Sequence, residues 1–195
     1  KWKDRVEIYG LDLRPAPSVE ILARYLVNKE THLDILVNNA AQTVRRPPGF
    51  FAHMQAGEAV RFQDIPDICR PLLKNYEECR QELGGGSRRG ARALLANEML
   101  TTWPEHHPAI GLEAPAKLAM IPYAYDSDTE AGLQIFPEGK LDADLQQVDL
   151  REKNTWRLKL AEVATPEMLE VHLINAVAPF ILCSKLKPLL LKSPC

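Results

Sequence analysis

Hydrophobic residues form two short runs near the start of the chain. In residues 5–13 polar and apolar positions alternate before the run turns apolar and ends at Asp12. Residues 33–37 are almost continuously apolar and are followed by two asparagines and two alanines. A short continuous run rich in Ile, Leu and Val is typical of a strand buried on both faces of a parallel sheet. The asparagines disfavour the alternative, a buried helical turn, because amides compete with helical hydrogen bonds.

A helical pattern separates the two runs. Four apolar residues recur at the spacing of one helical face: Val19, Leu22, Ala23 and Leu26. Ser18 precedes them as the predicted N-cap. A strand, a helix and a strand with short loops form a right-handed parallel crossover, which brings Asp12 and residues 38–41 to one edge of the sheet. Ligands of open α/β sheets bind at this edge, beyond the carboxyl ends of the strands. The sequence therefore predicts an α/β fold with part of a Rossmann-like doubly wound parallel sheet.

The long middle of the chain, residues 44–164, is predicted to be a mostly helical or irregular insertion. Apolar residues at helical spacing follow Pro66 and predict an amphipathic helix that ends at Gly84. Residues 88–100 predict a second helix, and the proline-rich stretch 104–122 is expected to be irregular. An insertion that leaves the sheet beside the binding edge is expected to cover its mouth, as a lid or as a subunit contact. The flanking segments, 1–43 and 165–195, make up the predicted binding domain.

A third helix is predicted to begin at Thr165-Pro166-Glu167, which supply an N-cap, a first-turn proline and a first-turn acid. Further along it, Pro179 lacks the N–H that the carbonyl of Asn175 would otherwise accept. We therefore expect a kink at this point and a carbonyl oxygen free to hold a water. The alternative is that Asn175 is an amide on a buried helix face, satisfied by a neighbour.

Two of these segments resemble the short-chain dehydrogenase/reductase family. Asn38-Asn39-Ala40-Ala41 is similar to its N-N-A-G element, with Ala41 in place of the usual glycine, and residues 174–180 resemble its V-N-x-x-x-P-F segment. The resemblance implies an NAD(P)-dependent oxidoreductase that transfers hydride between the nicotinamide of NAD or NADP and a carbonyl or alcohol substrate. It implies a catalytic role for Asn175 in holding a water of the proton relay. It also implies cofactor contacts for Asp12, Leu13, Asn38, Ala40 and Ala41.

Parts of the family pattern are not in the sequence. The glycine-rich turn is expected before Arg5, and the catalytic Ser and Tyr-x-x-x-Lys are expected after the asparagine helix, but neither is found there. We therefore expect an internal piece of a longer protein, which by itself is inactive and binds dinucleotide weakly or not at all. Micromolar NAD(P)H affinity would overturn this expectation.

Three alternatives stay open. Asp12 is read either as a cofactor contact or as a turn aspartate after a strand. A catalytically silent NAD(P)-binding regulator or scaffold is the second hypothesis for the function. A flavodoxin-like or receiver-type domain would explain an aspartate at a strand end, but not the two asparagine motifs together.

Composition changes this picture little. The chain has 195 residues, 46% of them hydrophobic, and a net charge of −2, which suits one core-bearing domain and gives no electrostatic case for a nucleic-acid partner. The four cysteines match no zinc template, so no metal site is predicted.

No apolar run approaches the roughly 18–20 residues of a membrane span, and the start resembles no signal peptide. We expect a cytoplasmic protein with a small-molecule partner and no membrane partner. The resemblance leaves room for a homo-oligomer, because the asparagine helix is commonly an interface in the family.

Overall fold

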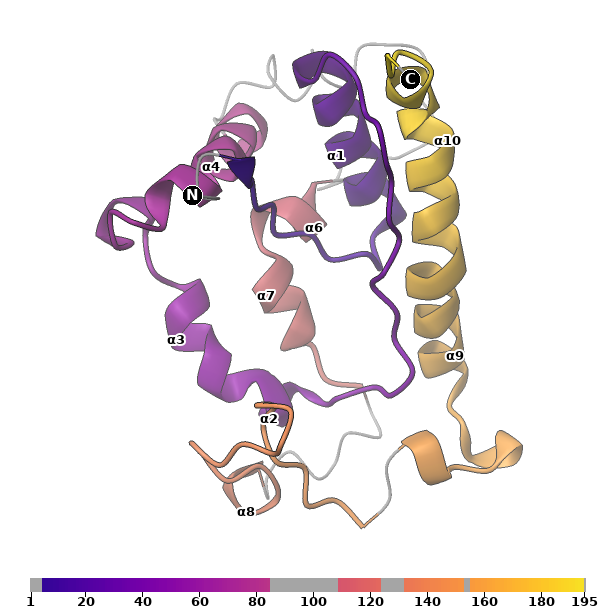
Figure 1. Ribbon diagram of the computed structural model, residues 1–195. Helices are drawn as coiled ribbons and strands as arrows, with labels where there is room; N and C mark the ends of the chain where they lie inside the picture. Colours follow the sequence, from indigo (N-terminus) through magenta and orange to yellow (C-terminus); the bar gives the residue numbers. More distant parts are fainter. Residues whose placement is uncertain (1–4, 85–108, 124–131, 153–154, 195) are drawn as a thin grey trace.

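The computed structural model describes residues 5–84, 109–123, 132–152 and 155–194, and most of their regular structure is helical. In chain order the elements are α1 (Ala16–Lys29), α2 (Pro48–Phe51), η2 (Ala52–Met54), α3 (Gln55–Glu58), η3 (Phe62–Asp64), α4 (Arg70–Gly84), α6 (Ile110–Glu113), α7 (Pro115–Ala119), α8 (Gly132–Ile135), η5 (Thr155–Arg157), η6 (Leu160–Glu162), α9 (Thr165–His172), the π-helical η7 (Leu173–Val177) and α10 (Ala178–Leu190). The last three follow one another without a break and form a long rod beside α1 (Figure 1). Helices α4, α6 and α7 lie on the side of α1 that faces away from this rod (Figure 1).

The predicted Rossmann-like parallel sheet is wrong for the part of the chain that the structure describes. Residues 5–13 and 33–41 include no β-strand, and β pairing in the described ranges is limited to an isolated antiparallel bridge between Leu141 and Gln147. A strand requires a ladder of hydrogen bonds to a neighbouring strand. The first segment instead bonds to the helical insertion, with Ile8 N donating to Leu72 O (2.8 Å) and Asp12 N to Gly111 O (2.9 Å).

The second predicted strand is only partly buried. Leu33 and Leu36 pack against the apolar face of α10, whereas Ile35 and Val37 are each 75% exposed. The continuous apolar run indicated burial on both faces, but among the described residues two of its four apolar side chains are left exposed. Leu33 N donates to Leu189 O (3.2 Å), so this segment too is bonded to a helix.

Helix α1 organises the hydrophobic core. Its buried residues belong to three apolar clusters: Val19 with Ala178 and Ile181, Ala23 with Leu186 and Leu189, and Ile21 and Leu22 with Ala109 and Leu112. The first two clusters join α1 to α10, and the third joins it to α6 and the residue before it. The predicted apolar face of α1 is therefore confirmed, although it packs between helices and not onto a sheet.

Both predicted N-caps are wrong, although both helices are present. Helix α1 begins at Ala16 with Pro15 as its N-cap, and α9 begins at Thr165 with Ala164 as its N-cap. The buried Ser18 hydroxyl accepts a hydrogen bond from Gly111 N (2.9 Å), so it joins α1 to α6 and does not cap its own helix. The acid predicted for the first turn of α9, Glu167, is confirmed.

The insertion contains the amphipathic helix that was predicted after Pro66. This helix is α4, and its residues Tyr76 and Leu83 pack against the core cluster of Ile21 and Leu112. The proline-rich stretch 104–122 was expected to be irregular, but its described part forms the short helices α6 and α7. The helix predicted over 88–100 lies outside the described residues.

The continuous helix Thr165–Leu190 is long and apolar enough, by length and composition alone, to cross a membrane. Its 26 residues include a window with mean hydropathy 1.4, of which 22% is buried inside the molecule. The helix crosses the point where Asn175 and Pro179 interrupt the apolar pattern. A core helix of a soluble protein passes the same test but is mostly buried, and one such helix is weak evidence, so the cellular location stays a prediction.

We expect Gly111→Ala to destabilise the protein by about 1–3 kcal/mol, the usual cost of overpacking. An added Cβ would lie 2.9 Å from Ser18 Cβ and Oγ and 3.0 Å from the backbone oxygen of Asp12. The backbone oxygen belongs to a segment that is itself hydrogen-bonded to Gly111, so it cannot easily move away. Chemical denaturation of the variant measures this effect.

Gly57→Ala in α3 is the matched control, because a Cβ there meets nothing within 4 Å. Relief of glycine's entropic cost should make it neutral or slightly stabilising. Equal stabilities for the two variants would show that α6 does not approach the 12–18 segment closely.

Candidate functional site

A pocket of about 370 Å³ lies where residues 11–14 meet residues 40–46. Asp12, Leu13, Ala40 and Ala41 line it, so four of the six residues singled out from the sequence share one site. The insertion supplies further lining residues, namely Val44, Arg45, Arg46, Phe51, Pro115 and Ala119. Two segments about thirty residues apart in the chain therefore meet at one pocket without a sheet to align them.

Asn38 and Asn175 lie outside the lining of this pocket. Asn38 points toward α10, where its Nδ2 donates to Cys183 Sγ (3.5 Å). Asn175 holds the backbone of Gln42, a lining residue: its Oδ1 accepts from Gln42 N (2.7 Å) and its Nδ2 donates to Gln42 O (2.8 Å). The side chain of Asn175 is thus an amide satisfied by a neighbour, and it holds one wall of the pocket in place.

The helix around Asn175 departs from α-helical bonding, as Pro179 predicts. Residues Leu173–Val177 are π-helical, and Ala178 N donates to Leu173 O, five residues back. Such π turns inside α-helices frequently mark functional sites. That the Asn175 carbonyl holds a water stays a prediction.

Glu170 is the centre of the polar network beside the pocket, and sequence reasoning missed it. Its side chain is 5% exposed and accepts hydrogen bonds from Gln42 Nε2 (2.7 Å), Tyr123 Oη (2.6 Å) and Arg14 Nη1 (3.4 Å). The Nε of the buried Arg45 lies 4.0 Å from the same carboxylate. Two guanidinium groups, an amide and a phenol therefore stabilise one buried negative charge. Glu170 and Asn175 together hold Gln42 by its side chain and by its backbone.

Asp12 is held by the residue two positions further on. Arg14 donates to it from its backbone N (2.9 Å to Oδ1), from Nε (3.0 Å to Oδ1 and 3.1 Å to Oδ2) and from Nη2 (2.5 Å to Oδ2). The Asp12 side chain is only 10% exposed. Both carboxylate oxygens therefore have cationic donors, and the reading of Asp12 as a turn aspartate matches this geometry. In the sequence, an arginine two residues after the aspartate is the pattern that indicates this local ion pair.

Tyr123 closes the network on the insertion side. Burial raises its pKa, and its hydrogen bond to Glu170 raises it further, so the phenol stays protonated as a donor. The guanidinium carbon of Arg45 lies 4.0 Å from the centre of the Tyr123 ring, a cation–π contact. Because residue 14, residues 42–45, residue 123 and residue 170 come from four distant parts of the sequence, no local pattern indicates this cluster.

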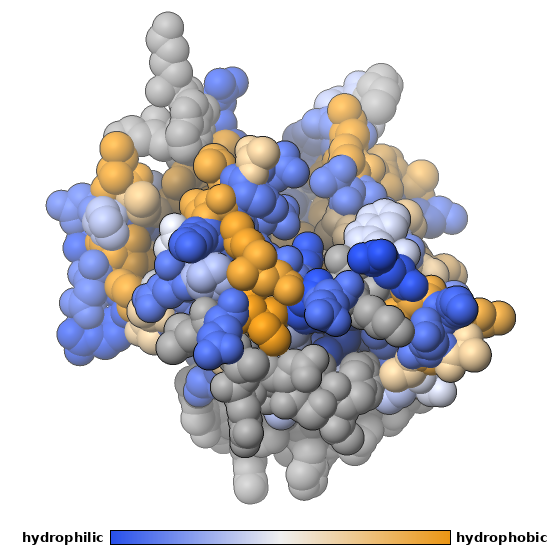
Figure 2. All heavy atoms as spheres, turned by 90° about the horizontal axis from the view of Figure 1, so that it is seen from below, coloured by the Kyte–Doolittle hydropathy of each residue, from blue (hydrophilic) through white to orange (hydrophobic). Residues whose placement is uncertain are grey.

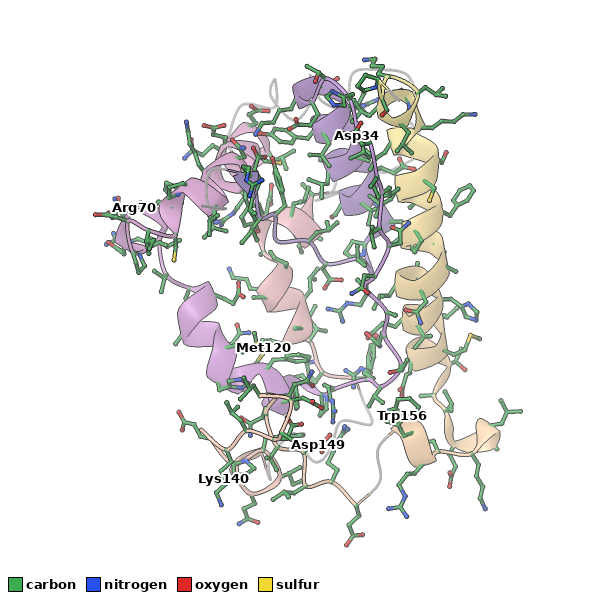
Figure 3. The ribbon with its side chains drawn as sticks, in the orientation of Figure 1. Asp34, Arg70, Met120, Lys140, Asp149 and Trp156 are labelled. Atoms are coloured by element: carbon green, nitrogen blue, oxygen red, sulfur yellow. The ribbon has the colours of Figure 1, made fainter. Side chains whose placement is uncertain are left out.

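A second ion-pair group lies at the end of the molecule that carries α2 (Figure 3). Asp149 is paired with Arg46, which lines the pocket, and with Arg151, whose Nε lies 2.9 Å from Oδ1 and Nη2 2.7 Å from Oδ2. Burial acts to raise the pKa of Asp149, but the hydrogen bonds and charge of Arg151 and the charge of Arg46 outweigh it and lower the pKa. The segments 45–46 and 149–151 are thereby fastened together.

Asp149 is expected to make the protein sensitive to acid. A carboxylate with a lowered pKa in the folded state stabilises the fold fully above its ordinary pKa of about 3.9. This stabilisation is lost as the pH falls through the lower, folded-state pKa. The variant Asp149→Asn should lose stability at neutral pH and show a smaller further loss below about pH 4. Thermal unfolding of both proteins across this pH range tests the expectation, and parallel pH profiles would contradict it.

The charged groups that line the pocket are three arginines, at positions 14, 45 and 46, and two carboxylates, Asp12 and Glu170. The lining therefore carries one more positive than negative charge, which favours a ligand with a negative group. Arginine suits phosphate and carboxylate groups because its planar fork donates in parallel. These side chains can bind and orient a ligand.

A Tyr-x-x-x-Lys spacing does occur in the chain, at Tyr25 and Lys29 of α1, where sequence reasoning did not look for it. Neither residue lines the pocket, and the Tyr25 hydroxyl donates to the backbone oxygen of Asn75 (3.3 Å). Burial, together with the neighbouring Cys79 and acidic groups, raises the pKa of Tyr25 to about 12. A catalytic tyrosine needs a pKa nearer to neutral. Tyr25 and Lys29 therefore have structural contacts, in which Lys29 Nζ donates to Tyr9 Oη (3.3 Å).

Among the residues that the structure describes, no group of three or more His, Cys, Asp or Glu side chains is placed to hold a metal ion. Comparison of the chain with protein-family models, with curated protein sequences and with solved structures finds no match.

Proposed function

We propose that the chain forms part of an NAD(P)-dependent oxidoreductase of the short-chain dehydrogenase/reductase type, and that its first pocket receives the adenosine side of the cofactor. The observation that carries the proposal is the meeting of Asp12 and Leu13 with Ala40 and Ala41 at one pocket. These are the positions at which the resemblance implies cofactor contacts. In the described residues these positions meet without the parallel sheet that the resemblance implies.

The size and charge of the pocket fit half of a dinucleotide. Its volume of about 370 Å³ is near the lower end of the roughly 300–1,000 Å³ of small-molecule pockets. Ala40 and Ala41 leave room for a ring or a sugar to approach the backbone. The lining as a whole carries one more positive than negative charge, which suits a phosphate group. When bound, the cofactor would supply the hydride chemistry, and these residues would hold and orient it.

Asn175 has a positioning role in this proposal. Its side chain fixes Gln42, and with it the wall that contains Ala41. Its backbone lies in the π-helical turn, where Pro179 removes a helical donor. The water-holding role that the resemblance implies rests on that carbonyl and not on the side-chain amide.

A specific observation favours the second hypothesis, a catalytically silent NAD(P)-binding regulator or scaffold. The carboxylate of Asp12 and the amide of Asn175 are both occupied by protein partners, which is how structural groups behave. The two hypotheses differ in turnover. A polypeptide that contains this chain and consumes NADPH only when a carbonyl compound is present supports the enzyme; cofactor binding without consumption supports the regulator.

Binding of NADPH to the 195-residue chain tests the proposed site. We expect millimolar affinity, worth only about −4 kcal/mol, detectable by NMR titration. Ala41→Leu should abolish binding, since the larger side chain fills the pocket beside Asp12. Ala161→Leu, at an exposed position of η6, is the matched control and should bind like the original chain. Equal binding by the two variants would place the nucleotide elsewhere and contradict the proposal.

A further inference from the structure

A second cavity, of about 690 Å³, shares a wall with the first pocket. Ala41, Gln42, Val44, Arg46 and Phe51 line both cavities. The wall therefore belongs to the segment that Glu170 and Asn175 hold in place through Gln42. The two cavities therefore adjoin through shared lining residues and provide neighbouring sites for two ligands.

The side of the second cavity that the insertion builds combines aromatic and apolar side chains with the polar His53, Gln146 and Gln147. Phe50 lies in an edge-to-face pair with Phe51, with ring centres 5.1 Å apart, and in another with Phe136 at 5.9 Å. Met54, Leu145 and Trp156 complete this side and are largely exposed. Figure 2 looks onto the end of the molecule that carries α8 and η5, and hydrophobic side chains are exposed there among hydrophilic ones. Exposed apolar surface around a concave site is typical of a ligand-binding site.

Leu145 adds an independent observation. Its φ of 60° lies in the left-handed region, which is strained for a leucine. The turn that holds it is fixed by Asp142, whose Oδ1 accepts from Asp144 N and Gln146 N at 2.9 Å each. The Leu145 side chain is left exposed at the cavity. Residues held in such conformations cluster at ligand-binding sites.

The charges of this lining differ from those of the first pocket. Among the residues that the structure describes, Arg46 is the charged side chain of this lining and His53 adds an imidazole ring; no carboxylate of these residues lines it, although Asp149 is paired with Arg46. The guanidinium carbon of Arg46 also lies 4.8 Å from the centre of the Phe50 ring. A planar apolar ligand with a negative or neutral polar end finds complementary groups here, whereas a cation does not.

We propose that the second cavity is the substrate site, and that it takes a ring-bearing apolar carbonyl or alcohol compound that is neutral or anionic and not cationic. The identification as substrate rests on the proposed oxidoreductase function. The chemical class rests on the aromatic side chains of the lining and on the guanidinium group of Arg46. The insertion thereby acquires a specific role, because it supplies Phe50, Trp156 and Leu145.

The test uses 8-anilinonaphthalene-1-sulfonate, a planar anionic dye whose fluorescence rises in apolar sites, with the 195-residue chain. We expect saturable binding that Trp156→Ala weakens about five- to tenfold, as truncation of an aromatic anchor does. Phe180→Ala on α10 is the matched control, because Phe180 and Trp156 are both 71% exposed and Phe180 lines neither cavity. Near-UV circular dichroism confirms that both variants keep their packing.

Two outcomes would overturn the inference. Equal affinities of the Trp156→Ala and Phe180→Ala variants would place the dye on general apolar surface. Binding of the cationic dye thioflavin T as tightly as the anionic dye would remove the charge argument. Neither of the two dye-binding experiments uses NADPH, and the separate NADPH titration reports on the first pocket. Failure of the second cavity is therefore distinguished from failure of the proposed cofactor site.

Discussion

Replacing Glu170 with alanine should lower the free energy of unfolding by about 3–5 kcal/mol, the usual cost of removing one partner from a buried ion pair. The change would leave the guanidinium groups of Arg14 and the buried Arg45 without their shared carboxylate. It would also remove the acceptor for Tyr123 and for the side chain of Gln42. Urea denaturation, followed by far-UV circular dichroism, measures the effect.

Two further variants separate charge from shape at this position. Glu170→Gln keeps the size of the side chain and one acceptor but loses the charge, so its stability should fall between those of the original chain and the alanine variant. Glu138→Ala, at an exposed position after α8, is the matched control and should change stability by less than about 0.5 kcal/mol. If Glu170→Ala behaved like Glu138→Ala, Glu170 would not be the centre of this network.

Truncation of Leu189 in α10 should cost about 2–5 kcal/mol, the range for a buried leucine replaced by alanine. Leu189 is 1% exposed and packs with Ala23 of α1 and Leu186. The cavity left behind would lie in the contact between α1 and α10, which supports the 33–41 segment through Leu33 and Leu36. The midpoint of urea unfolding measures the loss.

Leu191, two residues later and 75% exposed, supplies the control for this prediction. Leu191→Ala should change stability by less than about 0.5 kcal/mol, because it removes little buried apolar area. A large loss at Leu191 and none at Leu189 would mean that the opposite face of α10 is the packed one.

Local patterns in the sequence predicted the helices well. The apolar spacing of Val19, Leu22 and Ala23 gave the packed face of α1, and the residues after Pro66 gave α4. These predictions depend on side chains three or four positions apart, which the periodicity of a helix places together whatever the rest of the chain does. Pro179 predicted a kink, because it removes one backbone donor; the structure has a π-helical turn at Leu173–Val177, and the kink itself stays a prediction.

The predicted sheet was wrong because a strand depends on a neighbour that the sequence does not identify. Residues 5–13 have a strand pattern, but Ile8 and Asp12 donate their backbone hydrogen bonds to Leu72 and Gly111 of the insertion. The apolar run at 33–37 likewise packs on α10 through Leu33 and Leu36, whereas Ile35 and Val37 are exposed. Periodicity describes how a segment distributes its side chains, and it does not specify which partner the backbone meets.

For the candidate site, the sequence located the walls of the pocket but not the residues that position them. Asp12, Leu13, Ala40 and Ala41 meet as expected, although helices and not strands bring them together. Glu170 and Tyr123 come from segments far from these walls in the chain, and only tertiary contacts unite them with Gln42. Asn38, by contrast, was expected at the site and contacts Cys183 on α10.

The most direct test of the central claim is an NMR titration of the isotope-labelled chain with adenosine monophosphate. If one pocket receives the adenosine side of the cofactor, the amide signals of Asp12, Leu13, Ala40 and Ala41 should shift together. All four should then yield a single dissociation constant. Shifts confined to one of the two segments, or to neither, would contradict the claim that they form one nucleotide site.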